Sequence, residues 1–211
     1  MGLAGSAMGM QNKAQLNGEI ETLAGKFAAL QQNPATRVPA DVLARARGIV
    51  LITSVKGGLI YAYRGGDGVA LVRDASGHWG APAFVSLNGS SLGFQAGGEK
   101  EFNVALLMTQ AAANDLVQSR FNFGAGVGGT AGTDHGGAKI SNAPASVLMY
   151  NEHSGLFGGA SVKGGEVSPD KDANAVYYGK AVSMDEILVG HHVQPTPAED
   201  KLIAEINQYS K

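Results

Sequence analysis

Several short patterns in this sequence combine residue types that could perform catalysis or hold a ligand. Residues 89–93 fit G-x-S-x-G, the turn that presents a nucleophilic serine to a histidine base in many acyl-transfer enzymes. A helix must follow that turn, but Phe94, Gln95 and Ala96 predict a strand or a turn instead. A serine hydrolase centred on Ser91 is therefore kept only as a third alternative.

A glycine pattern that could cradle a phosphate follows further along the chain. Gly124, Gly126 and Gly129 fit G-x-G-x-x-G, which binds a pyrophosphate when a strand precedes it and a helix begins within it. The next residues, 130–137, are mostly small turn formers, so no helix is expected to begin there. Nucleotide binding is not predicted, and the alternating glycines indicate a close approach of backbones instead.

Residue types that bind metal ions are present, but their spacing is incomplete. Asp170, Asp172 and Asn174 match three ligand positions of a calcium loop, whereas alanines stand where that loop needs glycine and glutamate. This segment is expected to form a turn. The adjacent His191 and His192 would point to different sides of an extended chain, and cysteine is absent. The sequence predicts neither a metal nor any other cofactor.

Composition indicates one folded domain. The sequence has 211 residues, of which 44% are hydrophobic and only 16% are charged, so a sizeable core is expected. The net charge of −2 offers no general attraction to nucleic acid, and no nucleic-acid partner is predicted. No run approaches the roughly 18 apolar residues of a membrane-spanning helix. Residues 1–10 are expected to be a cloning or signal-peptide remnant, and residues 11–211 to be the domain.

The elements that must position these residues begin with an amphipathic helix, predicted over residues 13–31. Leu16, Ile20, Leu23, Phe27 and Leu30 recur at steps of four and three, which is the period of one apolar stripe. The opposite face mixes lysines with glutamates. This mixture favours packing on the core over insertion into a membrane, and both uses of the stripe stay open.

Most of the remaining chain predicts short, glycine-rich β-strands separated by Gly or Asp turns. They are expected at residues 49–55, 59–63, 69–73, 83–87, 92–96, 102–108, 120–126, 138–140, 146–150 and 156–162. Further helices are predicted at 39–47 and 110–119, and after the capping boxes of Ser183 with Glu186 and Thr196 with Glu199. The predicted fold class is α+β, with a mainly antiparallel sheet or barrel-like core flanked by N-terminal, middle and C-terminal helices.

Several segments taken together resemble one known family. Residues 39–49 read PADVLARARGI and residues 68–73 read GVALVR, and both are similar to the opening of the SYLF domain. The segments WGAPAFVSL at 79–87, GFQAG at 93–97 and DAN at 172–174 continue the similarity in register. Because the resemblance spans residues 37–188, chance matching explains it far less well than it explains any single motif.

Resemblance to the SYLF family implies a non-enzymatic domain that binds phosphoinositides or an anionic membrane surface. In its eukaryotic members an amphipathic N-terminal helix with basic residues helps to engage the membrane, and residues 16–30 occupy the comparable place. Removal of residues 1–33 is expected to abolish lipid binding and to leave the rest of the domain folded. The lipid-binding residues proposed in this way are Leu16, Ile20, Leu23, Lys26, Phe27, Arg37, Arg45 and Arg47.

The resemblance also sets expectations for partners and location. The chain looks like a stand-alone bacterial member, so peripheral contact with membrane lipids is expected and actin is not expected as a partner. The alternative function is a protein-interaction or structural module of the bacterial envelope that uses the glycine-rich strands. The expected location is the periplasm or envelope if a signal peptide has been removed, and the cytoplasm otherwise.

Overall fold

The computed structural model is an α+β fold, which confirms the predicted class. It describes residues 11–57, 62–87, 99–118, 121–123, 146–153, 155–156, 165–190, 193 and 196–211. Residues 1–10 and the strands predicted at 92–96 and 138–140 lie outside this part of the chain. The same holds for Ser91, for the glycines at 124, 126 and 129, and for His191 and His192.

Six helices and eight strands make up the described part of the chain. The helices are α1 (Lys13–Gln32), α2 (Ala40–Arg45), α3 (Gln110–Val117), α4 (Lys171–Tyr178), α5 (Met184–Leu188) and α6 (Pro197–Gln208). The strands are β1 (Gly48–Gly57), β2 (Ala62–Val72), β3 (Ala83–Leu87), β4 (Glu99–Leu107), β5 (Phe121–Phe123), β6 (Val147–Asn151), β7 (Gly155–Leu156) and β8 (Gly165–Pro169).

The strands form one sheet in the order β5-β8-β3-β2-β1-β4-β6-β7, and every described pairing is antiparallel. The end strands β5 and β7 do not pair with each other in the described part, so the sheet is open there. Of the two predicted arrangements, the antiparallel sheet is confirmed, and closure into a barrel is not found among these strands. The sheet grows outward on both sides of the β1–β2 hairpin, because β4 returns beside β1 and β8 lies beside β3.

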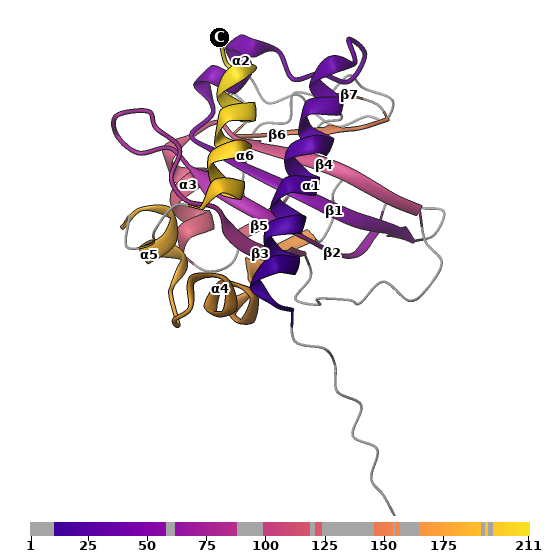
Figure 1. Cartoon of the computed structure of the whole chain (residues 1–211). Helices are drawn as coiled ribbons and strands as arrows, with labels where there is room; N and C mark the ends of the chain where they lie inside the picture. The colour runs from indigo at the N-terminus through magenta and orange to yellow at the C-terminus, as the bar shows by residue number, and fades with distance from the viewer. Residues whose placement is uncertain are drawn as a thin grey trace, which may run out of the picture.

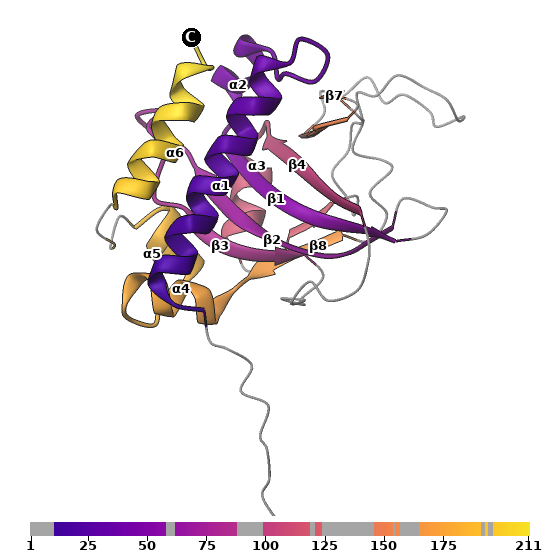
Figure 2. The same cartoon turned by 45° about the vertical axis from the view of Figure 1, so that its right-hand side comes forward.

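Helices cover both faces of the sheet, and each face has its own hydrophobic core (Figure 2). Along β1, Ile49 and Leu51 point to the face that carries α1, α4 and α6. Val50 and Ile52 point to the face that carries α3 and α5. Alternation of side chains along a strand produces this division. Burial on both faces explains why these strands read as nearly continuous apolar runs.

The first and last described helices, α1 and α6, lie side by side across one face of the sheet (Figure 1). α1 begins at a reciprocal cap, in which the Asn12 N–H donates to Gln15 Oε1 and the Gln15 N–H donates to Asn12 Oδ1. At the other end, the Phe27 ring meets the Tyr209 ring edge-on, with 6.1 Å between the centroids. Burial of a side chain such as Phe27 contributes about 2–3 kcal/mol to folding. α1 is therefore part of the core.

Two helix starts predicted from capping boxes are confirmed. The Glu186 N–H donates to Ser183 Oγ at 3.2 Å, and Glu186 Oε2 accepts from the Ser183 N–H at 2.8 Å. The same reciprocal pattern joins Thr196 and Glu199 at the start of α6. Each box supplies two hydrogen bonds to backbone groups that the helix itself leaves without partners.

The segment that begins at Asp170 is a helix and not the predicted turn. Asp170 Oδ1 accepts from the Ala173 N–H at 2.9 Å, so this carboxylate is the N-cap of α4. An aspartate side chain accepts the same short-range backbone hydrogen bond in a turn and at a helix N-cap. The positions of the Asp residues in the sequence therefore do not distinguish a turn from the start of a helix. α4 ends at Gly179, whose φ of 71° is left-handed and suits glycine.

The two strands predicted at 59–63 and 69–73 belong to one strand, β2, in its described part. The intervening glycines were interpreted as a turn, but they serve close approach of the neighbouring backbone. A Cβ on Gly68 would lie 1.9 Å from the Leu51 carbonyl oxygen, and one on Gly66 would lie 2.6 Å from the Thr53 carbonyl oxygen. Glycine inside a strand is expected where another backbone comes this close.

Candidate functional site

The predicted lipid-binding residues on the apolar stripe of α1 face the sheet. Leu16, Ile20 and Phe27 are 0% exposed, and Leu23 is 2% exposed. They share one core with β1, β2, β4 and α6. In this conformation the stripe holds α1 on the sheet, so these side chains could enter a membrane only after α1 had detached. Their lipid role stays a prediction. Within the described ranges, no helix is long and apolar enough to cross a bilayer.

The predicted cations do not all lie together. Lys26 Nζ lies 5.8 Å from the centroid of the Phe102 ring on β4. Arg47 is placed at the other end of that strand, where its N–H donates to the Leu107 carbonyl at 2.7 Å. Five residues of a strand span about 17 Å, so Lys26 and Arg47 sit at separate places along the sheet.

Arg37, Arg45 and Arg47 are exposed and belong to the short stretch around α2. Arg45 and Asp41 lie one helical turn apart, and Arg45 Nη2 forms an ion pair with Asp41 Oδ2 at 2.9 Å. Both partners are well exposed, and such a pair contributes only about 0.3–0.5 kcal/mol. It can open at little cost when a stronger acidic partner approaches. This stretch is the predicted basic surface that the structure leaves accessible.

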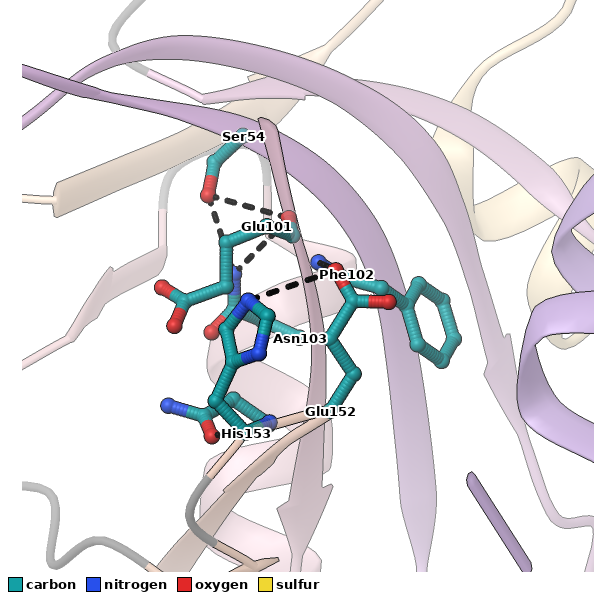
Figure 3. Close-up of polar contacts among 7 residues, drawn as sticks. Ser54, Glu101, Phe102, Asn103, Glu152 and His153 are labelled. Carbon is teal, nitrogen blue, oxygen red and sulfur yellow. Dashed lines mark hydrogen bonds and ion pairs between the residues drawn. The ribbon is translucent and has the colours of Figure 1, made fainter. Parts of the chain in front are cut away.

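A buried polar group lies on the other face of the sheet, where β1 and β4 pair (Figure 3). Asn103 Nδ2 donates to Ser54 Oγ at 2.9 Å and to the Glu101 carbonyl at 3.2 Å. Ser54 and Glu101 are 0% exposed, and Asn103 is 5% exposed. Because an amide cannot remove a proton from a hydroxyl, Asn103 holds Ser54 in place without activating it as a nucleophile.

An acid and an imidazole lie close to that group. Glu152 Oε1 accepts from the Phe102 N–H at 2.8 Å and is 4.0 Å from His153 Nε2. Figure 3 shows the Glu152 carboxylate beside the backbone of Phe102, on the side of Asn103 away from Ser54. The hydroxyl of Ser54 therefore has an amide and a carbonyl as its described partners and no base. The hydrogen bond from the Phe102 N–H to Glu152 links β4 to the turn that follows β6.

A second buried polar group joins α4 to α6. Glu199 is 1% exposed, its Oε1 accepts from the Tyr178 hydroxyl at 3.1 Å, and its Oε2 accepts from the Thr196 N–H at 3.2 Å. Burial raises the pKa of Glu199 to about 7, although these hydrogen bonds act to lower it. The neighbouring Tyr177 hydroxyl donates to Asn17 of α1 at 3.0 Å. The capping pattern predicted the helix start but not the buried carboxyl.

Three carboxyl groups from separate elements interact between α1 and the sheet. Burial, followed by Asp67 and Asp170, raises the pKa of Glu19 to about 7. Burial and Asp170 likewise raise the pKa of Asp67 to about 6. No group of three or more side chains in the described ranges is arranged to hold a metal ion. Burial, together with the nearby like charges, thus shifts Glu19 and Asp67 towards their protonated forms.

Comparison with known proteins places this fold in a family. A family model described as Ysc84, a Las17-binding protein actin regulator, matches residues 88–209. Over 171 residues the chain is 32% identical to LAS seventeen-binding protein 3 of Saccharomyces cerevisiae, covering 78% of this chain and 37% of that protein. It is 30% identical over 175 residues to SH3 domain-containing YSC84-like protein 1 of Rattus norvegicus, covering 81% of this chain and 51% of that protein. The chain spans about half or less of the length of these relatives.

These matches overturn the expectation about actin. The family is described by actin regulation, so the prediction that excluded actin as a partner is wrong. That prediction rested on the likeness to a stand-alone bacterial member, yet the similarity reaches proteins whose name includes an SH3 domain. The SYLF resemblance is confirmed, because the family model covers more than half of the sequence. This chain therefore belongs to the Ysc84 family of SYLF domains.

Proposed function

We propose that this chain is a non-enzymatic interaction domain that binds actin filaments. The observation that carries the proposal is the burial of the whole apolar stripe of α1, which commits this helix to the core. A helix held in this way supports a rigid protein-binding surface and does not act as a membrane anchor. The family description, which names an actin regulator, supports the choice of partner.

The basic stretch around α2 is the surface that we propose for this contact. Arg37, Arg45 and Arg47 are exposed there. Among the described residues, Arg45 is held by Asp41, through their surface ion pair and a hydrogen bond to the Asp41 carbonyl. Arginine binds carboxylates through a planar fork of two N–H groups, so the stretch suits an acidic protein surface. The buried polar groups around Asn103 and Glu199 form hydrogen bonds within the fold, which supports a binding role over catalysis at those two places.

Co-sedimentation with filamentous actin tests the proposal. We expect the wild-type chain to pellet with filaments and to be released as salt is raised. The double variant Arg45→Glu with Arg47→Glu should bind about tenfold more weakly, because each charge reversal replaces attraction with repulsion. The matched control is Lys171→Glu with Lys201→Glu, which makes the same change of charge at exposed positions on α4 and α6. Wild-type protein that stays in the supernatant at saturating filament would reject the proposal.

The second candidate function is binding to an anionic membrane surface, including one that contains phosphoinositides. The exposure of the same three arginines favours it, since each Lys or Arg near such a surface contributes about 1 kcal/mol. The stripe residues Leu16 and Phe27 would add to this binding only if α1 left the sheet. A surface contact and an inserted helix are thus two separable mechanisms.

Vesicle co-sedimentation combined with hydrogen exchange separates these mechanisms. Comparison of neutral with anionic vesicles, each at low and physiological salt, measures the electrostatic contribution to membrane binding. Exchange of the α1 amides measures whether the helix stays docked. Anion-dependent binding with unchanged α1 protection would indicate a surface contact, and lost protection would indicate detachment. No binding to any vesicle would reject the lipid-binding function. Actin binding would still be decided by the filament co-sedimentation experiment.

A further inference from the structure

Three buried N–H donors in two adjoining side chains have no acceptor among the residues that the structure describes: Nε and Nη2 of Arg73 and Nε1 of Trp79. Arg73 directly follows β2, and a β-bridge joins it to Trp79 on the returning segment. Trp79 is only 6% exposed, so bulk water does not readily take the place of the missing acceptor. Buried donors are nearly always satisfied in folded proteins, and the exceptions often mark a missing ligand or ion.

The guanidinium group of Arg73 is oriented by contacts that use neither unsatisfied donor. Its Cζ lies 4.2 Å from the centroid of the Trp79 ring, in a cation–π stack. Its Nη1 donates to the Gly77 carbonyl at 2.7 Å. The edge that is left over, Nε with Nη2, is the fork with which arginine grips two oxygens of one anion. The indole N–H of Trp79 belongs to the ring beneath that fork, so the donors share one small region.

The charge of Arg73 is not balanced by a carboxylate. Arg73 makes no ion pair in the part of the chain that the structure describes. Burial lowers its pKa, and the nearby Arg47 lowers it further. The Arg73 N–H donates to the Arg47 carbonyl at 2.8 Å, which sets the two arginines on adjacent strand ends. The neighbouring Asp74 uses its carboxylate within the turn, where its Oδ1 accepts from the His78 N–H at 2.9 Å.

We propose that Arg73, Trp79 and Arg47 form a binding site for a phosphate-type oxyanion. A phosphate-type anion presents several oxygens to the three unsatisfied donors, and it can carry two negative charges, which matches the two arginines. Arg47 is exposed and supplies the second positive charge at the entrance. Inorganic phosphate and the headgroup of a phosphomonoester lipid present the same chemistry to such a site. Arg47 also belongs to the surface proposed for actin, but the phosphate site rests on the unsatisfied donors of Arg73 and Trp79 and is tested without actin.

The turn 74–78 joins Arg73 to Trp79 and contacts the Arg73 guanidinium. Its tip, Ala75 and Ser76, is exposed, and Gly77 holds a left-handed φ of 85°. The Gly77 carbonyl is the one acceptor now bound by the Arg73 guanidinium. Because the Nε and Nη2 atoms are buried, an anion reaches this fork only if the turn moves.

Tryptophan fluorescence tests the proposal directly, because Trp79 is the only tryptophan in the sequence. Inorganic phosphate should change its emission saturably at an ionic strength held constant with sodium chloride. Phosphatidylcholine vesicles with and without phosphatidic acid test the lipid source of the same group. Saturation by either source supports the site and identifies that source. Unchanged emission and no heat of binding with both sources would overturn it.

Matched variants assign the binding to the fork. Arg73→Lys keeps the charge but loses the fork, so we expect phosphate to bind about tenfold more weakly or worse. Arg47→Gln should also weaken binding, whereas Arg45→Gln should not, since Arg45 pairs with Asp41 on the surface of α2. Thermal melts establish that each variant is folded. If Arg73→Lys does not fold, Trp79→Phe removes the indole donor, and calorimetry measures the loss. An Arg73→Lys variant that binds phosphate as tightly as the wild type would refute the site.

Discussion

Asn174 binds both backbone polar groups of Phe84. Its Oδ1 accepts from the Phe84 N–H at 2.8 Å, and its Nδ2 donates to the Phe84 carbonyl at 2.9 Å. This amide, 1% exposed, takes the place of a neighbouring strand at the point where β8 has ended and α4 has begun. The contact fixes α4 to β3, and with it the Tyr178 hydroxyl that reaches Glu199.

Replacement of Asn174 by alanine should therefore lower the free energy of unfolding by about 2–4 kcal/mol. The Phe84 N–H loses its acceptor inside the core, which costs about 1–3 kcal/mol. The Phe84 carbonyl keeps the Asp170 N–H as a donor but loses one hydrogen bond, which costs about 1 kcal/mol more. Urea unfolding at pH 7 measures the loss. Asn114→Ala is the control, because Asn114 is exposed on α3 and should change stability by less than about 0.5 kcal/mol. Equal effects of the two variants would contradict the role assigned to Asn174.

Glu199 should make stability decrease as pH rises. Its pKa is raised from the ordinary 4.5 to about 7, so the folded state binds its proton more tightly than the unfolded state does. The contribution is fully present below pH 4.5 and is lost as pH rises to about 7, with an upper limit on the order of 3 kcal/mol. Urea unfolding from pH 5 to pH 8 should show this slope. It should be smaller in Glu199→Gln and unchanged in Glu205→Gln on the same helix.

Glu19→Gln should stabilise the protein at pH 8 and have little effect at pH 5. Its pKa is raised to about 7, so at pH 8 the wild-type side chain is ionised near Asp67 and Asp170, whereas at pH 5 it is protonated. We expect a gain of about 1 kcal/mol at pH 8, because the variant removes a charge that is costly to bury and that is repelled by the two aspartates. Glu21→Gln, at an exposed position on the same helix, is the control. A gain that is the same at both pH values would disprove the electrostatic cause.

Two glycine substitutions should have opposite effects. Gly68→Ala places a Cβ 1.9 Å from the Leu51 carbonyl oxygen, so it should cost about 3 kcal/mol or more through displacement of β1. Gly25→Ala meets nothing within 4 Å on the exposed side of α1 and should add up to about 1 kcal/mol through helix propensity. Thermal melts of the two variants provide the comparison. A stable Gly68→Ala variant would show that β2 does not need glycine at this position.

Phe27→Ala should cost about 3–5 kcal/mol, because it opens a cavity between α1 and α6. By the same reasoning, deletion of residues 1–33 should unfold the domain, which reverses the expectation from sequence that the rest would stay folded. Far-UV circular dichroism with thermal melting measures both changes. Glu21→Ala, exposed on the same helix, is the control for Phe27→Ala. A deletion variant with a cooperative melt would contradict the assignment of α1 to the core.

Elements with strong local signals could be predicted from the sequence. The steps of four and three from Leu16 to Leu30 gave α1 nearly to its ends, and the boxes at Ser183 and Thr196 marked α5 and α6. These signals succeed because they depend on residues within one or two turns of each other. The central strands were also found, since each is an apolar run buried on both faces.

Features that depend on distant residues could not be predicted. Periodicity gives the apolar stripe of α1 but not whether a sheet or a membrane covers it, so the predicted lipid site includes side chains of the core. The glycines of β2 resemble a turn until β1 lies beside them. The stacking of Arg73 on Trp79 also could not be predicted from local sequence patterns. The one available signal is a single tryptophan six residues after an arginine that follows a strand.

The pairing of α1 with α6 has a consequence for biosynthesis. Leu202 and Ile206 of α6 complete the same core as Leu16 and Phe27, so nearly the whole chain separates the partners in sequence. During translation the sheet is assembled while one of its apolar faces still lacks α6. Contacts this remote form slowly, and an uncovered face invites aggregation. The nascent chain should therefore depend on chaperones until residue 206 has left the ribosomal exit tunnel.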